Sequence, residues 1–182
     1  MDNNKFRTIK FAFSLIVDQV LAIFATTIVI NIVSLFLPDD VSLVLQFVLG
    51  IFVFGAICYI DTWGKGAADF GRAKSNQIKT SPFFGFVFGL VGIIPSFLIA
   101  FCAFLAETGA VSFYSLLGED VFTIINRFWQ MPLSSLFVFV NETPILNLVA
   151  PFFVCIISGI GYFLGYKGIA IKRYILFKNG SK

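Results

Sequence analysis

The chain has 182 residues, of which 58% are hydrophobic and 13% are charged, and its formal net charge is +3. Soluble domains have about 45–50% apolar and about 25% charged residues, so this composition indicates an integral membrane protein. Histidine is absent, which excludes histidine-based catalytic triads and histidine-ligated metal centres. The three cysteines lie far apart within apolar runs, and we expect no disulfide, bound metal or cofactor.

Four long apolar runs predict an all-α, polytopic fold in a single membrane domain that covers residues 1–182. A helix of about 20 residues crosses the hydrocarbon of a bilayer. The four transmembrane helices are predicted at 11–37, 41–60, 82–106 and 144–166.

Prolines mark the ends and the bends of these helices. Pro38 follows the first helix, and Pro82 and Pro144 begin the third and fourth, because proline fits the first turn of a helix but disrupts later turns. Pro95 and Pro151 lie inside the third and fourth helices. Each removes a backbone donor, so we expect a bend at each and a carbonyl one turn earlier that needs another partner.

The longest polar run, residues 61–81, separates the second and third helices and is predicted to be a cytoplasmic loop. We expect Trp63 at the membrane boundary, then a flexible glycine turn, then a short basic helix that ends near Asn76. Such a loop can bind a lipid headgroup or a partner protein, or it can be a plain connection. Its candidate binding residues are Trp63, Lys65, Asp69, Arg72 and Lys74.

Residues 107–142 form neither a clean span nor a polar loop, because charges and Pro132 interrupt their short apolar pieces. Apolar segments of about 10–14 residues are more often interfacial or re-entrant than transmembrane. We predict two or three short helices that lie on the outer surface or dip into it, with two extra spans as the alternative. Aromatic residues of this segment suit the headgroup boundary; they are Phe113, Tyr114, Phe122, Phe128 and Trp129.

Basic residues predict the orientation of the chain in a cell membrane. With four spans, Arg127 is the one basic residue of the 13 that falls on the outer side. Because cytoplasmic segments are rich in lysine and arginine, both termini are predicted to be cytoplasmic. The tail, 167–182, is basic and amphipathic, and we expect it to lie on the anionic inner leaflet.

Asp18 is the one charged residue predicted to lie well inside a span. A carboxylate at that depth is costly and should face protein or water. Ser14, Ala22 and Thr26 recur with it every fourth residue, and Asn31 continues the polar stripe. Asp18 and Asn31 are therefore candidate contacts for an ion, a proton or a substrate; alternatively, Asp18 is a hydrogen-bonded packing residue.

Small residues predict close helix packing in the third and fourth spans. Gly85 and Gly89 are four residues apart, as are Gly161 and Gly165, and this spacing lets two helix backbones approach each other. Packing within one bundle and self-association both agree with the pattern.

In length and hydrophobicity the chain resembles the substrate-binding components of energy-coupling-factor vitamin transporters. That resemblance implies six helices, two of which would have to come from 107–142, and the first helix lacks the AxxxA motif of those proteins. We expect a non-enzymatic accessory or regulatory subunit that binds a membrane-protein partner or a second copy of itself, and no nucleic acid. The alternative is a transporter or channel component for a small molecule or an ion, including one that is similar to the vitamin carriers, that uses the stripe around Asp18.

Overall fold

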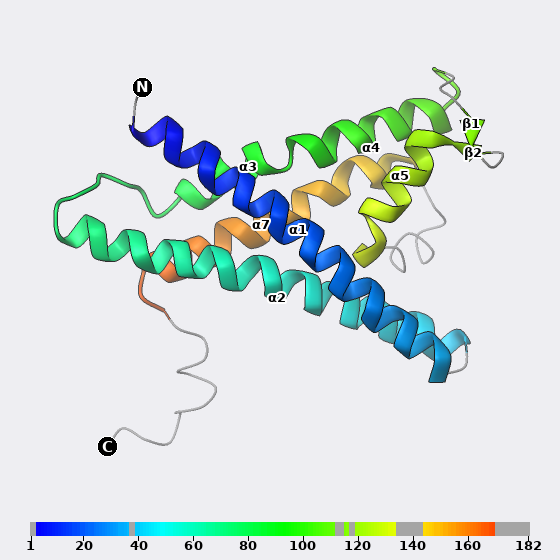
Figure 1. The fold of residues 1–182 in the computed structure, drawn as a ribbon, viewed down its shortest axis with the longest axis horizontal. Helices are drawn as coiled ribbons and strands as arrows, with labels where there is room; N and C mark the ends of the chain where they lie inside the picture. The colour runs from blue at the N-terminus through cyan, green and yellow to red at the C-terminus, as the bar shows by residue number, and fades with distance from the viewer. Residues whose placement is uncertain (1–2, 37–38, 112–114, 117–118, 134–143, 170–182) are drawn as a thin grey trace.

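The computed structural model describes residues 3–36, 39–111, 115–116, 119–133 and 144–169 (Figure 1). Within these residues the regular elements are helices, apart from one short antiparallel β pair, β1 with β2. The elements are α1 (Asn3–Phe36), α2 (Asp39–Lys74), α3 (Phe84–Gly92), α4 (Ile94–Glu107), β1 (Ser115–Leu116), β2 (Glu119–Asp120), α5 (Val121–Trp129), the 3₁₀ helix η1 (Met131–Leu133) and α7 (Pro144–Tyr166).

Three of the described helices are long and apolar enough to cross a membrane: Lys5–Phe36 in α1, Val44–Lys74 in α2 and Ile145–Tyr166 in α7. The pair α3 and α4 passes the same test together and makes a fourth candidate span, bent by 46°. The all-helical, membrane-type fold expected from the composition is therefore present. The direction in which the helices cross a membrane stays a prediction.

Large apolar side chains are exposed along the outside of the helices, as at Phe13, Phe52 and Phe83, which are 61–70% exposed. Contiguous exposed apolar surface is unfavourable in water. Lipid tails are its natural surroundings, so the outward faces of the helices agree with a membrane location.

The second helix is longer than predicted. It continues through the segment expected to be a loop and ends at Lys74, so the polar connection to α3 is correspondingly short. The glycine turn expected after Trp63 is wrong, because Gly66 lies inside the helix against the backbone of Tyr162 and Tyr166 in α7. A glycine that allows close packing of a neighbouring helix cannot be distinguished in the sequence from a glycine in a turn.

The bend predicted at Pro95 is present. Ile93 separates α3 from α4, and Pro95 lies in the first turn of α4, where a proline needs no backbone donor. The third helix begins two residues later than expected, at Phe84, and the hydroxyl of Ser81 accepts a hydrogen bond from the backbone N–H of Phe83 at 3.3 Å.

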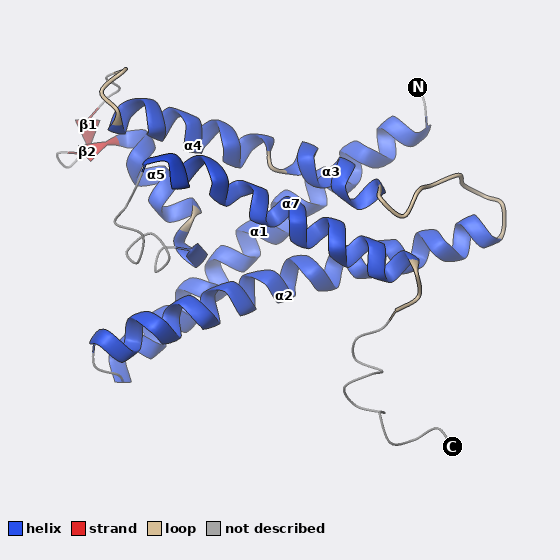
Figure 2. Cartoon of the chain, turned by 180° about the vertical axis from the view of Figure 1, so that it is seen from behind, coloured by secondary structure: helices blue, strands red, loops and turns tan. Residues whose placement is uncertain are grey.

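The helices meet at one end of the molecule and diverge at the other, as Figures 1 and 2 show. The start of α1, the end of α2, α3 and the end of α7 lie together, while the α1–α2 hairpin and the α4–α5 pair point apart. The core lies where α7 packs against α2 and α3. Its buried apolar residues are Leu15, Ala22, Phe54, Cys58, Phe88, Ile93, Val154, Cys155 and Tyr162.

The segment between α4 and α7 packs into the bundle. Helix α5 lies along α4, and η1 contacts both α1 and α2. The indole of Trp129 donates a hydrogen bond to Ser96 in the first turn of α4, and the expected position of the aromatic residues at the headgroup boundary stays a prediction. Phe113, Tyr114 and the tail beyond residue 169 lie outside the described residues.

Candidate functional site

A row of charged residues lies along one face of α2, in the half of the helix that was expected to be a loop. Asp61, Lys65, Asp69 and Arg72 are spaced by three or four residues, which puts them on one side of a helix with alternating signs. Arg7 and Asp18 of α1 face this row. We call the six residues the charged cluster.

Asp69 is the centre of one half of the charged cluster. Its side chain is 0% exposed, and its Oδ2 atom is 2.5 Å from Nη2 of Arg7. The same oxygen accepts a hydrogen bond from the hydroxyl of Tyr162 at 2.8 Å, and Arg72 lies 3.6 Å from the other oxygen. One buried carboxylate thus joins α1, α2 and α7. Such pairing is what makes a charge tolerable away from water.

Lys65 is the centre of the other half. Its ammonium group binds Asp61 one turn earlier and lies 3.9 Å from Oδ2 of Asp18 on α1. Two carboxylates therefore face one cation. The ammonium also lies 5.6 Å from the ring centroid of Phe11 and 6.0 Å from that of Phe88, distances at which an aromatic face attracts a cation.

An open cavity of about 430 Å³ adjoins the charged cluster. Asp61, Lys65, Asp69 and Arg72 line it, and Phe11 supplies an apolar wall. Ligand pockets for small molecules have about this volume and combine apolar walls with a few polar groups. No three His, Cys, Asp or Glu side chains of the described residues come together as a metal site.

The candidate residues proposed from the sequence lie in several places. Asp18 joins the cluster with Lys65, Asp69 and Arg72, whereas Lys74 is exposed at the end of α2. Trp63 faces the end of α7, where its indole donates to the carbonyl of Ile169 at 2.9 Å. Asn31 lies in the opposite half of α1 and donates to Thr27 of its own helix.

Sequence reasoning missed Arg7, Asp61 and Tyr162 as members of this site. Asp61 and Lys65 are four residues apart, which indicates a shared helical face, but the segment was predicted to be a loop. Arg7 and Tyr162 are 62 and 93 residues from Asp69, and no local pattern relates positions so far apart.

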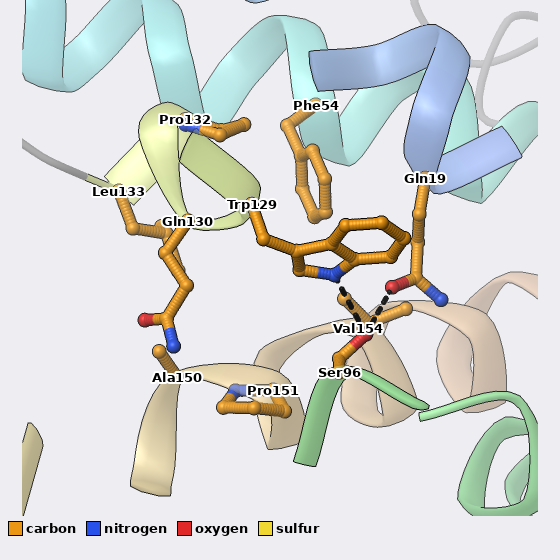
Figure 3. Close-up of a pocket in the computed structure, with 10 residues that line it drawn as sticks. All are labelled: Gln19, Phe54, Ser96, Trp129, Gln130, Pro132, Leu133, Ala150, Pro151 and Val154. Atoms are coloured by element: carbon orange, nitrogen blue, oxygen red, sulfur yellow. Dashed lines mark hydrogen bonds between the residues drawn. The ribbon is translucent and has the colours of Figure 1, made fainter. Parts of the chain in front are cut away.

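A second polar group lies at the bend between α3 and α4 (Figure 3). Gln19 donates to the carbonyl of Gly92 at 3.3 Å and accepts a hydrogen bond from the hydroxyl of Ser96 at 2.8 Å. The indole N–H of Trp129 donates to the same hydroxyl at 2.8 Å. We call Gln19, Ser96, Trp129 and Gln130 the bend network.

Gln130 binds a backbone carbonyl near the second internal proline, Pro151, as Gln19 does near Pro95. Pro151 has no N–H, so the carbonyl of Asn147 four residues earlier lacks its helical donor. The side-chain amide of Gln130 donates to that carbonyl at 3.1 Å and to the side chain of Asn126 at 2.7 Å. The bent pair α3–α4 and the proline-containing helix α7 therefore each have a glutamine from elsewhere in the chain bound to one of their carbonyls.

The four glycines proposed for packing lie at helix contacts. A Cβ atom at Gly85 would come within 2.5 Å of Tyr162, and one at Gly89 within 2.6 Å of the Ser158 hydroxyl. Gly161 and Gly165 lie against the backbone of α2. These contacts hold α7 against α2 and α3, and so hold Tyr162 at the charged cluster.

Comparisons of the chain with known protein families, curated proteins and solved structures found no match.

Proposed function

We propose that this protein is a component of membrane transport that binds an ion or a small polar solute in the cavity beside the charged cluster. The observation that carries the proposal is the gathering of both carboxylates and cations around one open cavity, in helices apolar enough to span a membrane. Ionisable residues within spanning helices mark ion and substrate pathways more often than packing contacts.

Stability alone is a poor reason for such a cluster. Burying a pair like Arg7 with Asp69 removes two charges from water, and well-packed apolar residues in their place are often equally stable or more stable. A cluster that also includes Asp18 and Lys65 multiplies that cost. A binding role accounts for the charges better, because a polar ligand needs partners of this kind once it leaves water.

The composition of the cavity wall suggests which ligands fit. Asp61 and Lys65 on the wall can exchange their mutual ion pair for contacts with a ligand of either sign, and Phe11 can pack against an apolar part. The two carboxylates that face Lys65 favour a cation or a solute with a cationic group. A small cation and a zwitterionic solute are therefore the ligand classes that we propose.

Thermal unfolding of the purified protein in detergent tests this binding. The probes are sodium chloride, potassium chloride and a set of amino acids, with choline chloride as the control for ionic strength. A ligand at about 100 times its dissociation constant stabilises the folded protein by about 2.7 kcal/mol. We expect at least one probe to raise the Tm of the wild type beyond the choline control.

Matched variants locate the site. Lys65→Met and Asp18→Asn should abolish the increase in Tm, whereas Lys74→Met, at the exposed end of the same helix, should keep it. No stabilising probe, or a full increase in Lys65→Met, would contradict the proposal. A stoichiometric larger partner that co-purifies from native membranes would instead favour the accessory-subunit function expected from the sequence.

A further inference from the structure

Asp18 and Asp69 are two carboxyl groups of the charged cluster with different surroundings. Asp69 is held as an ion, because Arg7 and Tyr162 both donate to its Oδ2 atom. The Oδ2 atom of Asp18 is buried and accepts no hydrogen bond from the described residues, and the ammonium of Lys65 lies 3.9 Å away from it. An ionised carboxylate only accepts hydrogen bonds and is costly to bury without donors. The surroundings of Asp18 therefore suit the neutral acid better than the ion.

Asp61 is a second carboxyl group beside Asp18. Both groups face the single ammonium of Lys65, which is bound to Asp61, and the two carboxyls lie within hydrogen-bond reach of each other. Two carboxylates this close repel each other, so one of the pair keeps a proton. The side chain of Asp61 is 33% exposed and holds the lysine, whereas that of Asp18 is 15% exposed. Asp18 is therefore the better place for the proton, and its O–H can donate to Asp61.

Among the described residues, few other titratable groups face Asp18. Those of α2 are Asp61, Lys65 and the thiol of Cys58. The helices α3 and η1, which also pack on α1, have no titratable side chain. On α1 itself the nearest charged residue of the described part is Lys10, more than two turns away. With Asp18 neutral, Asp61 negative and Lys65 positive, the net charge of these three residues is zero.

A cation in the cavity would change the pairing of these groups. Asp61 and Lys65 line the cavity, and a cation that binds the carboxylate of Asp61 takes the place of the lysine. The freed ammonium can then pair with Asp18, which is already 3.9 Å away, and that pairing favours the ionised carboxylate. The net charge of the site is zero before the cation binds and zero after the proton has left. A neutral site suits helices that are surrounded by lipid.

We infer that the charged cluster exchanges one proton for one monovalent cation, and that Asp18 is the group that holds and releases the proton. The O–H bond of Asp18 breaks, its electron pair stays on the carboxylate, and the proton passes to water. The inference rests on the proposed function and narrows its two ligand classes to a cation. Because the proton and the cation compete for the site, low pH should weaken cation binding.

Infrared spectroscopy of the ligand-free protein in detergent tests whether Asp18 is protonated. A neutral carboxylic acid has a C=O stretching band that a carboxylate lacks. At neutral pH this band should be present in the wild type and lost in Asp18→Asn. Asp120→Asn is the matched control. Asp120 caps the N-terminus of α5, where asparagine serves as well as aspartate, and this variant should keep the band.

A pH-indicator dye in weakly buffered solution measures the protons that cation binding releases. The probes are sodium chloride and potassium chloride, with choline chloride as the control for ionic strength. The wild type should release up to about one proton per bound cation. Its apparent dissociation constant should rise up to about tenfold for each unit by which the pH is lowered. Cys58→Ala removes the thiol that faces Asp18 and should release as many protons as the wild type, whereas Asp18→Asn should release none.

The outcomes separate this inference from the proposed function. Absence of the Asp18 band from the ligand-free protein would overturn the exchange and leave the proposed function standing. Cation binding without proton release would do the same, as would a Tm that rises with amino acids alone. If no probe raised the Tm at any pH, the proposed function and the exchange would both fail.

Discussion

The charged cluster and the bend network are both polar groups between apolar helices, but they satisfy their polar atoms differently. The charged cluster pairs full charges, such as Arg7 with Asp69, beside an open cavity. The bend network uses neutral groups, such as Gln19 and Ser96, around a water-sized space. A charge needs water or a strong partner nearby, whereas amides and hydroxyls can be satisfied by each other. The difference indicates that the charged end has the better access to water.

Among the variants that test this comparison, we expect the largest loss of stability from a change at Asp69. Asp69→Asn leaves the buried guanidinium of Arg7 without its counter-charge, and breaking a buried pair in this way costs about 3–5 kcal/mol. Unfolding of the purified protein in mixed detergent micelles, followed by circular dichroism, measures the loss. The double variant Arg7→Leu with Asp69→Leu removes both charges and should recover most of it. If Asp69→Asn were as stable as the wild type, the pair would not be buried as described.

The next largest change in stability is expected at the glycines of α2 near the charged cluster. Gly66→Ala forces a methyl group against the backbone of Tyr162 and Tyr166, and such overpacking costs up to about 3 kcal/mol. Gly64→Ala is the control, because its Cβ meets nothing within 4 Å among the described residues. There the better helix propensity of alanine should stabilise by about 0.5–1 kcal/mol. The same unfolding measurement should therefore show opposite signs two residues apart, and equal signs would contradict the helix contact.

A smaller loss is expected in the bend network. Gln19→Met keeps a similar length but leaves the carbonyl of Gly92 and the hydroxyl of Ser96 without one partner each. An unsatisfied buried polar group costs about 1–3 kcal/mol. The loss should be independent of salt concentration, since no charge is involved. An effect of Gln19→Met equal to that of Asp69→Asn would remove the distinction between the two regions.

The smallest effect is expected at Arg72. Its side chain is 54% exposed and lies 3.6 Å from the carboxylate of Asp69, and exposed ion pairs contribute about 0–1 kcal/mol. Arg72→Met should therefore lower stability slightly, and the difference from the wild type should shrink as salt is added. A loss that matches Asp69→Asn would show that Arg72, rather than Arg7, is the main partner of the carboxylate.

The parts of the fold that follow local rules could be predicted from the sequence. Pro144 begins α7, Tyr166 ends it, and the bend near Pro95 is present. These features depend on proline geometry and on the length of apolar runs, which neighbouring residues determine.

The extension of α2 was missed because glycines and charges are ambiguous in sequence. Gly66 and the charges from Asp61 to Arg72 look like a loop until the face that they share is recognised. Gln19 follows Asp18 in the sequence but is not part of the polar stripe that the fourfold spacing predicts. The partner of Gln19, Ser96, is 77 residues away, and a contact across that separation follows from packing rather than from local pattern.

The position of Asp69 also determines when the charged cluster can be completed during synthesis. Its partners are residues 7 and 162, and the second of these is made 93 residues after Asp69 itself. At typical synthesis rates that interval is roughly 5 to 20 seconds. During this time the carboxylate can pair with Arg7 but has no tyrosine hydroxyl, so the full set of contacts of Asp69 forms only after α7 has been made. A chain that ended before residue 162 would therefore keep the ion pair between α1 and α2 without the hydrogen bond that joins it to α7.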